Sequence, residues 1–176
     1  MRKFASIVLV VLFFISCEGP YIFNRVVHLK DGNQMLLGGV DRTAFEKAPF
    51  SDWYLEAYEA YSVDQQYVKS IKKNIKNYRV EVFLGTWDED SRLRYPEFMK
   101  ILDEVKFPKQ RLLTYAVNTS KKSFYSEESG KGIDALPVFI FYQGKKEVGR
   151  IVGAATSGSL EEDIVRIVDK AYLNNN

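Results

Sequence analysis

The chain has 176 residues, of which 46% are hydrophobic and 14% aromatic, so it can bury the core of one globular domain. Its 25 basic and 23 acidic residues give a formal net charge of +2, so the composition does not indicate a nucleic-acid partner, which would require a basic face. Residues 1–16 include Arg2 and Lys3 but no acid, so a chain without them has a net charge of about zero.

The N-terminus is a short basic region followed by an apolar run over residues 4–15, too short for a comfortable transmembrane helix. It predicts a secretory signal peptide over residues 1–16. Ser16-Cys17 then resembles the lipobox of bacterial lipoproteins, although Phe14 replaces the Leu usual in that motif. We therefore expect Cys17, the only cysteine, to be lipidated and to anchor the protein on a membrane of the bacterial cell envelope, facing an extracytoplasmic space. An ordinary signal peptide and an uncleaved anchor are the alternatives.

Residues 17–63 predict a tether followed by an N-terminal extension. Two apolar stretches, 26–30 and 34–37, flank Asp31-Gly32, which is a favoured hairpin turn. A helix predicted from Asp52 carries a stripe of side chains at three- and four-residue spacing. That spacing favours packing against the core, with ligand stacking as the alternative. The stripe consists of Trp53, Tyr54, Ala57, Tyr58 and Tyr61.

A second amphipathic helix is predicted to begin after Asp64. Its apolar positions are Val68, Ile71 and Ile75, and its lysines are Lys69, Lys72, Lys73 and Lys76. We interpret the lysines as a solvated face, with contact to acidic lipid as the alternative.

The remaining pattern, over residues 64–173, predicts a mixed α/β domain. Apolar strands at 79–84 and 112–117 are joined by a helix over 91–106, and the short crossover makes these two strands parallel. The inward residues of that helix are expected to be Leu93, Phe98, Ile101, Leu102 and Val105. A polar loop over 118–134 precedes an antiparallel hairpin at 138–152. The sequence Ser159-Leu160-Glu161-Glu162 matches a capping box and opens a last helix.

One segment carries the main functional indication. Trp87 follows the first strand, and Asp88 and Ser91 come next at the spacing of a Cys-x-x-Cys motif. Pro96 lies in the following helix, and Leu136-Pro137-Val138 opens a later strand. Together these features resemble the thioredoxin family, in particular a subgroup of envelope proteins. The resemblance implies a thioredoxin-like fold over residues 64–173, with a central mixed sheet flanked by helices.

The resemblance also implies a binding groove formed by Trp87, Asp88, Pro137 and Val138. Thioredoxins have a cis proline at the position of Pro137, and the backbone before it pairs with an extended protein segment. The groove is therefore expected to bind a protein or peptide segment of the envelope.

The residues that carry thioredoxin chemistry are missing. Asp88 and Ser91 occupy the cysteine positions, and Val82 stands where the family has a buried acid that assists proton transfer. Because disulfide exchange needs a thiolate nucleophile, no catalytic residue is intact, and we predict a redox-inactive binding or scaffolding protein with no cofactor. One alternative is a thiol-disulfide oxidoreductase of the thioredoxin family that uses Cys17 as a free thiol. Another is a purely structural envelope component.

Asp88 has two interpretations at the start of the predicted helix. In the first, Asp88 or Asp90 caps the helix. In the second, Asp88 mimics the charge of the family's thiolate in the field of the helix N-terminus. We expect no metal at Asp88, Glu89 and Asp90, because adjacent residues rarely converge on one ion. His28 is the only histidine, so a zinc site is not expected either.

Overall fold

The computed structural model describes residues 23–169. The predicted signal peptide and Cys17 lie outside this range, as do residues 170–173 of the expected domain. The described part begins with β1 (Val26–His28), β2 (Gln34–Leu36), β3 (Gly38–Val40), the 3-10 helix η1 (Arg42–Phe45), α1 (Phe50–Ala60), α2 (Gln65–Asn74) and η2 (Ile75–Asn77). It continues with β4 (Arg79–Leu84), α3 (Glu89–Glu104), η3 (Lys109–Arg111), β5 (Leu112–Ala116), β6 (Val138–Gln143), β7 (Lys146–Val152) and α4 (Leu160–Val168).

The central feature is a five-stranded mixed sheet in the order β3-β5-β4-β6-β7. β4 and β5 are parallel, with Val82 opposite Thr114. The other pairs in the sheet, β3–β5, β4–β6 and β6–β7, are antiparallel. The predicted parallel pair and the predicted closing hairpin are therefore both confirmed, and the chain has a mixed α/β fold.

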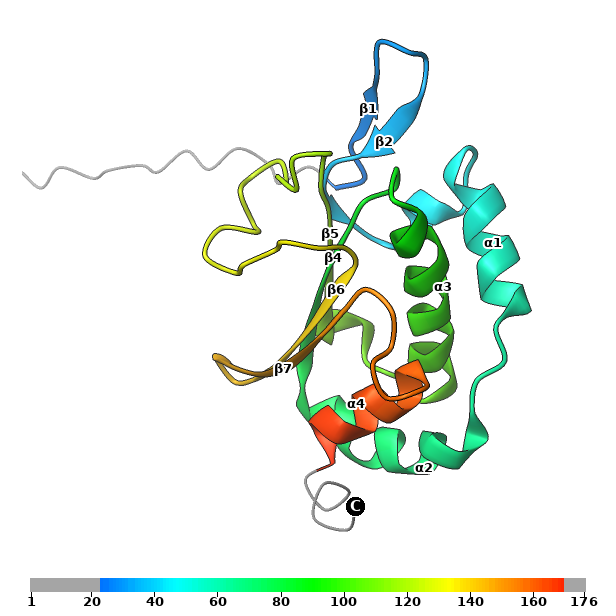
Figure 1. Cartoon of the computed structure of the whole chain (residues 1–176), viewed down its shortest axis with the longest axis vertical. Helices are drawn as coiled ribbons and strands as arrows, with labels where there is room; N and C mark the ends of the chain where they lie inside the picture. The colour runs from blue at the N-terminus through cyan, green and yellow to red at the C-terminus, as the bar shows by residue number, and fades with distance from the viewer. Residues whose placement is uncertain (1–22, 170–176) are drawn as a thin grey trace, which may run out of the picture.

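The two faces of the sheet are covered differently (Figure 1). Helices α1 to α4 lie on one face, and the long segment between β5 and β6 runs over the other. Successive side chains of β4 point to opposite faces of the sheet, as the two-residue period of a strand requires. Val80, Val82 and Leu84 are buried in the cluster that contains the helices, whereas Phe83 is buried in a second cluster with Ile140. Within residues 23–169, no helix is both long enough and apolar enough to cross a membrane.

Helix α3 begins at Glu89 and carries Pro96 in its interior. Its buried face includes Ser91, Tyr95, Phe98 and Leu102, which recur at three- and four-residue spacing. Leu93 lies two residues from both Ser91 and Tyr95, so it points the other way and is 44% exposed. The prediction that Leu93 points inward was wrong, whereas those for Phe98, Ile101, Leu102 and Val105 are confirmed.

The segment assigned to an N-terminal extension takes part in the same core. β1 and β2 form the predicted hairpin, and β3 adds an edge strand beside β5. In α1, Tyr54 is 2% exposed, and its ring stacks on that of Phe45 with 5.2 Å between centroids. Trp53, Tyr58 and Tyr61 pack against the same cluster. The aromatic stripe is thus a packing surface, as the spacing predicted.

The predicted helix after Asp64 is also confirmed. The Asp64 side chain accepts a hydrogen bond from the Gln66 N–H at 2.9 Å and caps α2. Ile71 and Ile75 are buried, whereas Lys69, Lys72, Lys73 and Lys76 are exposed. At the end of the chain, Ser159 caps α4 by accepting the Glu162 N–H at 3.1 Å.

Candidate functional site

Asp88 and Ser91 form a closed pair at the start of α3. One carboxylate oxygen of Asp88 accepts both the Ser91 N–H at 2.8 Å and the Ser91 hydroxyl at 2.7 Å. Ser91 is fully buried, and its hydroxyl oxygen accepts the Gly85 N–H at 3.1 Å. The Asp88 carboxylate therefore acts as the helix N-cap, and it ties the helix to the loop after β4.

Trp87 is held in place by a hydrogen bond and by close packing. Its indole Nε1–H donates to the Val117 carbonyl at 2.9 Å, and its ring packs on the second core cluster. A Cβ at Gly85 would lie 2.8 Å from the indole Cε2, so only glycine allows the ring to fold back over the loop. Trp87 is consequently a half-buried, ordered part of the site.

The loop between β4 and α3 is tied on both sides. The Thr86 hydroxyl accepts the backbone N–H of Leu36 at 3.1 Å, and the Thr86 carbonyl accepts the Arg92 Nε–H at 2.7 Å. Thr86 is itself fully buried. These bonds fix the loop to β2 and to α3, so Trp87 and Asp88 sit on a rigid support.

The Leu136–Pro137 peptide bond is cis, as the resemblance implies. The Pro137 carbonyl accepts the Gly153 N–H at 2.8 Å. Leu136 and Val138 belong to the cluster on which Trp87 packs, so the structure brings these two segments together.

Val138 does not line an open groove, because it is only 1% exposed and its backbone lies between Phe83 of β4 and Val152 of β7. The exposed residues beside the proline are Asp134 and Ala135. These two residues, rather than Val138, are the ones that a partner can reach.

A buried acid does occur in β4, but one residue before the position considered in the sequence. Glu81 is 4% exposed and lies on the face opposite the helices, where its carboxylate binds Lys131 Nζ at 2.7 Å and also pairs with Arg79. Lys131 further lies over the rings of Phe83 and Tyr115, 5.2 and 5.6 Å from their centroids. Burial, with Glu81 nearby, raises the pKa of Tyr115.

Glu81 therefore fastens the long loop between β5 and β6 to the sheet, and its carboxylate is engaged by two cations. Val82, for which the resemblance to thioredoxins implies a buried acid, is fully buried among apolar side chains. Sequence reasoning missed Glu81, although a charged residue inside an apolar strand was a visible signal of a buried partner. His28 is exposed in β1. In the described part of the chain, no three metal-ligating side chains gather at one point.

Comparisons with known proteins give a likeness of fold only. No family model matches the sequence, and no curated protein matches it. A solved structure of a protein of unknown function from Pseudomonas aeruginosa is similar, with a TM-score of 0.50 and 12% sequence identity. The match covers 78% of this chain and 81% of that one.

Proposed function

We propose that this chain is a thioredoxin-like lipoprotein of the bacterial envelope that has no redox activity and binds an extended protein or peptide segment beside Trp87, Asp88 and Pro137. The observation that carries the proposal is the closed pair of Asp88 and Ser91. A thioredoxin-like frame is retained, while the two thiol positions hold side chains that satisfy each other.

The strand order supports the fold half of the proposal. The segment from β4 onward runs strand, helix, strand, long loop, two strands and helix, an order similar to that of thioredoxins. β3 precedes this segment and pairs with β5 at the edge of the sheet.

The position of the site supports binding there. Trp87 and Asp88 follow the carboxyl end of β4, where one neighbouring strand is parallel and the other antiparallel. In open α/β sheets, ligands are commonly bound outside the carboxyl ends of the strands, where connections leave in opposite directions. The exposed residues Asp134 and Ala135 border the same place.

The charge around the site indicates what kind of segment fits. Glu89 and Asp90 are exposed in the first turn of α3, and Asp134 is exposed before Pro137. The Asp88 carboxylate is already hydrogen-bonded to Ser91 as the helix cap. The exposed carboxylates of Glu89, Asp90 and Asp134 are therefore the ones that attract a positively charged partner. They favour a segment that bears lysine or arginine over one that bears acids.

Redox chemistry is unsupported at this site. A carboxylate does not form the mixed disulfide through which thiol exchange proceeds. Val82 supplies no proton acceptor, and the carboxylate of Glu81 faces away from α3 and is paired with Lys131. Lipidation of Cys17 would remove the one remaining thiol, which leaves binding as the function that the frame can serve.

The test is a fluorescence titration of the full-length chain in phospholipid nanodiscs. Trp53→Phe leaves Trp87 as the reporter at the site, because the chain has two tryptophans. Lysine-containing unstructured peptides should change Trp87 emission with saturation, whereas glutamate-containing peptides of the same length should not. Asp134→Lys should weaken binding, and Lys146→Glu on β7 is the control for an unrelated change of charge. No saturable change with any peptide would contradict the proposal.

A further inference from the structure

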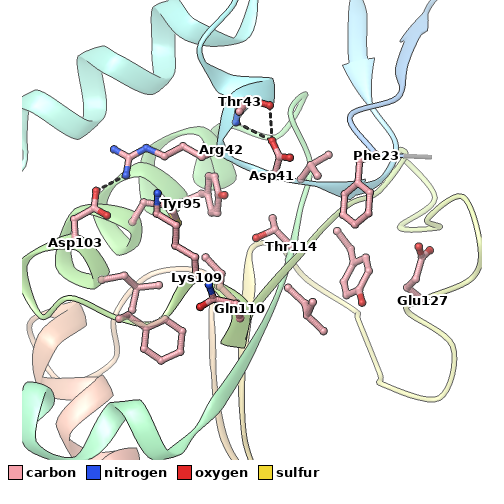
Figure 2. A pocket seen from close by; sticks show the side chains of 17 residues that line it. Phe23, Asp41, Arg42, Thr43, Tyr95, Asp103, Lys109, Gln110, Thr114 and Glu127 are labelled. Carbon is pink, nitrogen blue, oxygen red and sulfur yellow. Dashed lines mark hydrogen bonds and ion pairs between the residues drawn. The ribbon is translucent and has the colours of Figure 1, made fainter. Parts of the chain in front are cut away.

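A separate cavity of about 560 Å³ lies beside the middle and the C-terminal half of α3 (Figure 2). Trp87, Asp88 and Pro137 are not among the residues that line it. It is bounded by α3, by η1 and by the start of β5. Its size falls within the range of sites that hold small organic molecules. The cavity could not be predicted from a sequence motif, because its lining residues come from separate stretches of the chain.

The walls of the cavity are mainly apolar. Met99 and Leu102 come from α3, Val40 from β3, and Phe107 and Leu112 from the segment that leads into β5. Met99, Leu102, Val40 and Phe107 are all buried with respect to solvent. Such a lining gains free energy when an apolar chain displaces water from it.

Each acid that lines the cavity is engaged by neighbouring groups, and Asp103 is also paired with a cation. Asp103 accepts a hydrogen bond from the Tyr58 hydroxyl at 2.7 Å. It also pairs with Arg42, as Figure 2 shows. Asp41 accepts the Thr43 N–H and the Asn24 amide, each at 2.9 Å.

Glu127, the third acid of the lining, is similarly engaged. It accepts the Tyr125 N–H at 3.0 Å. All three carboxylates are thus held by neighbouring groups, and the charge of Asp103 is offset by that of Arg42.

Lys109 differs from these residues. It lines the cavity beside Gln110 and is exposed. Within residues 23–169, no hydrogen bond or ion pair joins its ammonium group to another residue. The cavity therefore presents apolar walls with one unpaired ammonium group at its rim, which can bond the anionic end of an apolar chain.

We propose that this cavity binds a long-chain carboxylate, with the hydrocarbon chain among Met99, Leu102 and Phe107 and the carboxylate at Lys109. The site is independent of the peptide-binding surface, so either proposal can fail without the other. Val40 and Leu112 complete the walls along the sheet edge.

The experiment is photolabelling of the full-length chain in nanodiscs with a diazirine analogue of palmitate that also carries an alkyne. Labelled peptides are mapped by mass spectrometry. Labelling should be saturable and should map to Met99–Phe107. The neutral alcohol of the same chain length should label less.

Two variants and a matched control sharpen the test. Lys109→Glu should weaken labelling about tenfold, the effect of losing one charge-assisted hydrogen bond. Lys146→Glu makes the same change of charge at an exposed position on β7 and should leave labelling unchanged. Leu102→Trp should fill the cavity and abolish labelling, with circular dichroism used to verify that the variant is folded.

Three outcomes would overturn the proposal. The first is labelling outside the cavity, and the second is equal labelling of wild type and Lys109→Glu. The third is a lipidated wild type that resists the probe while Cys17→Ser accepts it. That result would mean that an acyl chain of the protein's own anchor fills the cavity in place of a free carboxylate.

Discussion

The Asp88 carboxylate lies 2.7 Å from the Ser91 hydroxyl and 2.8 Å from the Ser91 backbone nitrogen, so the two residues at the spacing of a Cys-x-x-Cys motif are each other's partners. Asp88 therefore caps the N-terminus of α3, and this role is sufficient to explain an aspartate at position 88. It also separates the peptide-binding proposal from Asp88 itself, since the carboxylate facing Ser91 is already occupied.

The first prediction concerns the helix cap. Asp88→Ala should lower the free energy of unfolding by about 1–2 kcal/mol, because it removes the N-cap of α3 and leaves the buried Ser91 hydroxyl with one bond fewer. Asp88→Asn keeps the acceptor and should cost less. Urea denaturation measures both, with Asp90→Ala as the control at an exposed position in the same turn. Equal stability of Asp88→Ala and wild type would show that the cap is unimportant.

The second prediction concerns the missing thiols. The double variant Asp88→Cys and Ser91→Cys should form an internal disulfide, detected by mass spectrometry as the loss of two hydrogen atoms, and should catalyse some insulin reduction by dithiothreitol. The wild-type chain should not accelerate that reaction. A wild type that accelerates it would restore the oxidoreductase alternative and direct attention to Cys17.

The third prediction concerns the buried ion pair that fastens the long loop. Glu81 is 4% exposed and binds Lys131 at 2.7 Å, so Lys131→Met should leave a buried charge poorly compensated. We expect a loss of about 3 kcal/mol in unfolding free energy, moderated by the contact with Arg79. The double variant with Glu81→Leu should recover part of this loss. A double-mutant cycle from urea denaturation tests the coupling, and purely additive effects would argue against it.

The fourth prediction concerns acid. Burial opposes ionisation of Glu128, but hydrogen bonds from the Ser123 hydroxyl and N–H, with Lys122 nearby, outweigh it and lower the pKa of the carboxyl. The stabilisation is therefore complete above the ordinary value of 4.5 and is lost as pH falls through the lower folded value. Hydrogen exchange in residues 118–134 should accelerate below that value. Glu128→Gln should raise exchange at neutral pH and flatten the dependence.

The sequence predicted helices α1 to α4 and four of the five strands of the sheet, because their periodicities are strong, but it did not predict the edge strand β3. The hairpin at Asp31-Gly32 and the caps at Asp64 and Ser159 followed from local chemistry. The prediction for Leu93 was wrong because Ser91 and Tyr95 define the buried face of the helix. Both side chains carry a hydroxyl group, so a pattern based on apolar residues alone did not place them inside.

Features that depend on long-range packing were less visible. The burial of Val138 follows from its position between two strands, and the coverage of one sheet face by a loop follows from packing of the whole chain. The cavity at Lys109 brings together residues far apart in the sequence. None of these has a local signature.

The most direct test of the central claim is photo-crosslinking in living cells from a photoreactive amino acid at Ala135, which is exposed beside Pro137, whereas Val138 is buried. We predict a discrete crosslinked protein, identified by mass spectrometry and weakened by Asp134→Lys but not by Lys146→Glu. A folded chain that gives no crosslink at Ala135 would contradict a binding surface at this site.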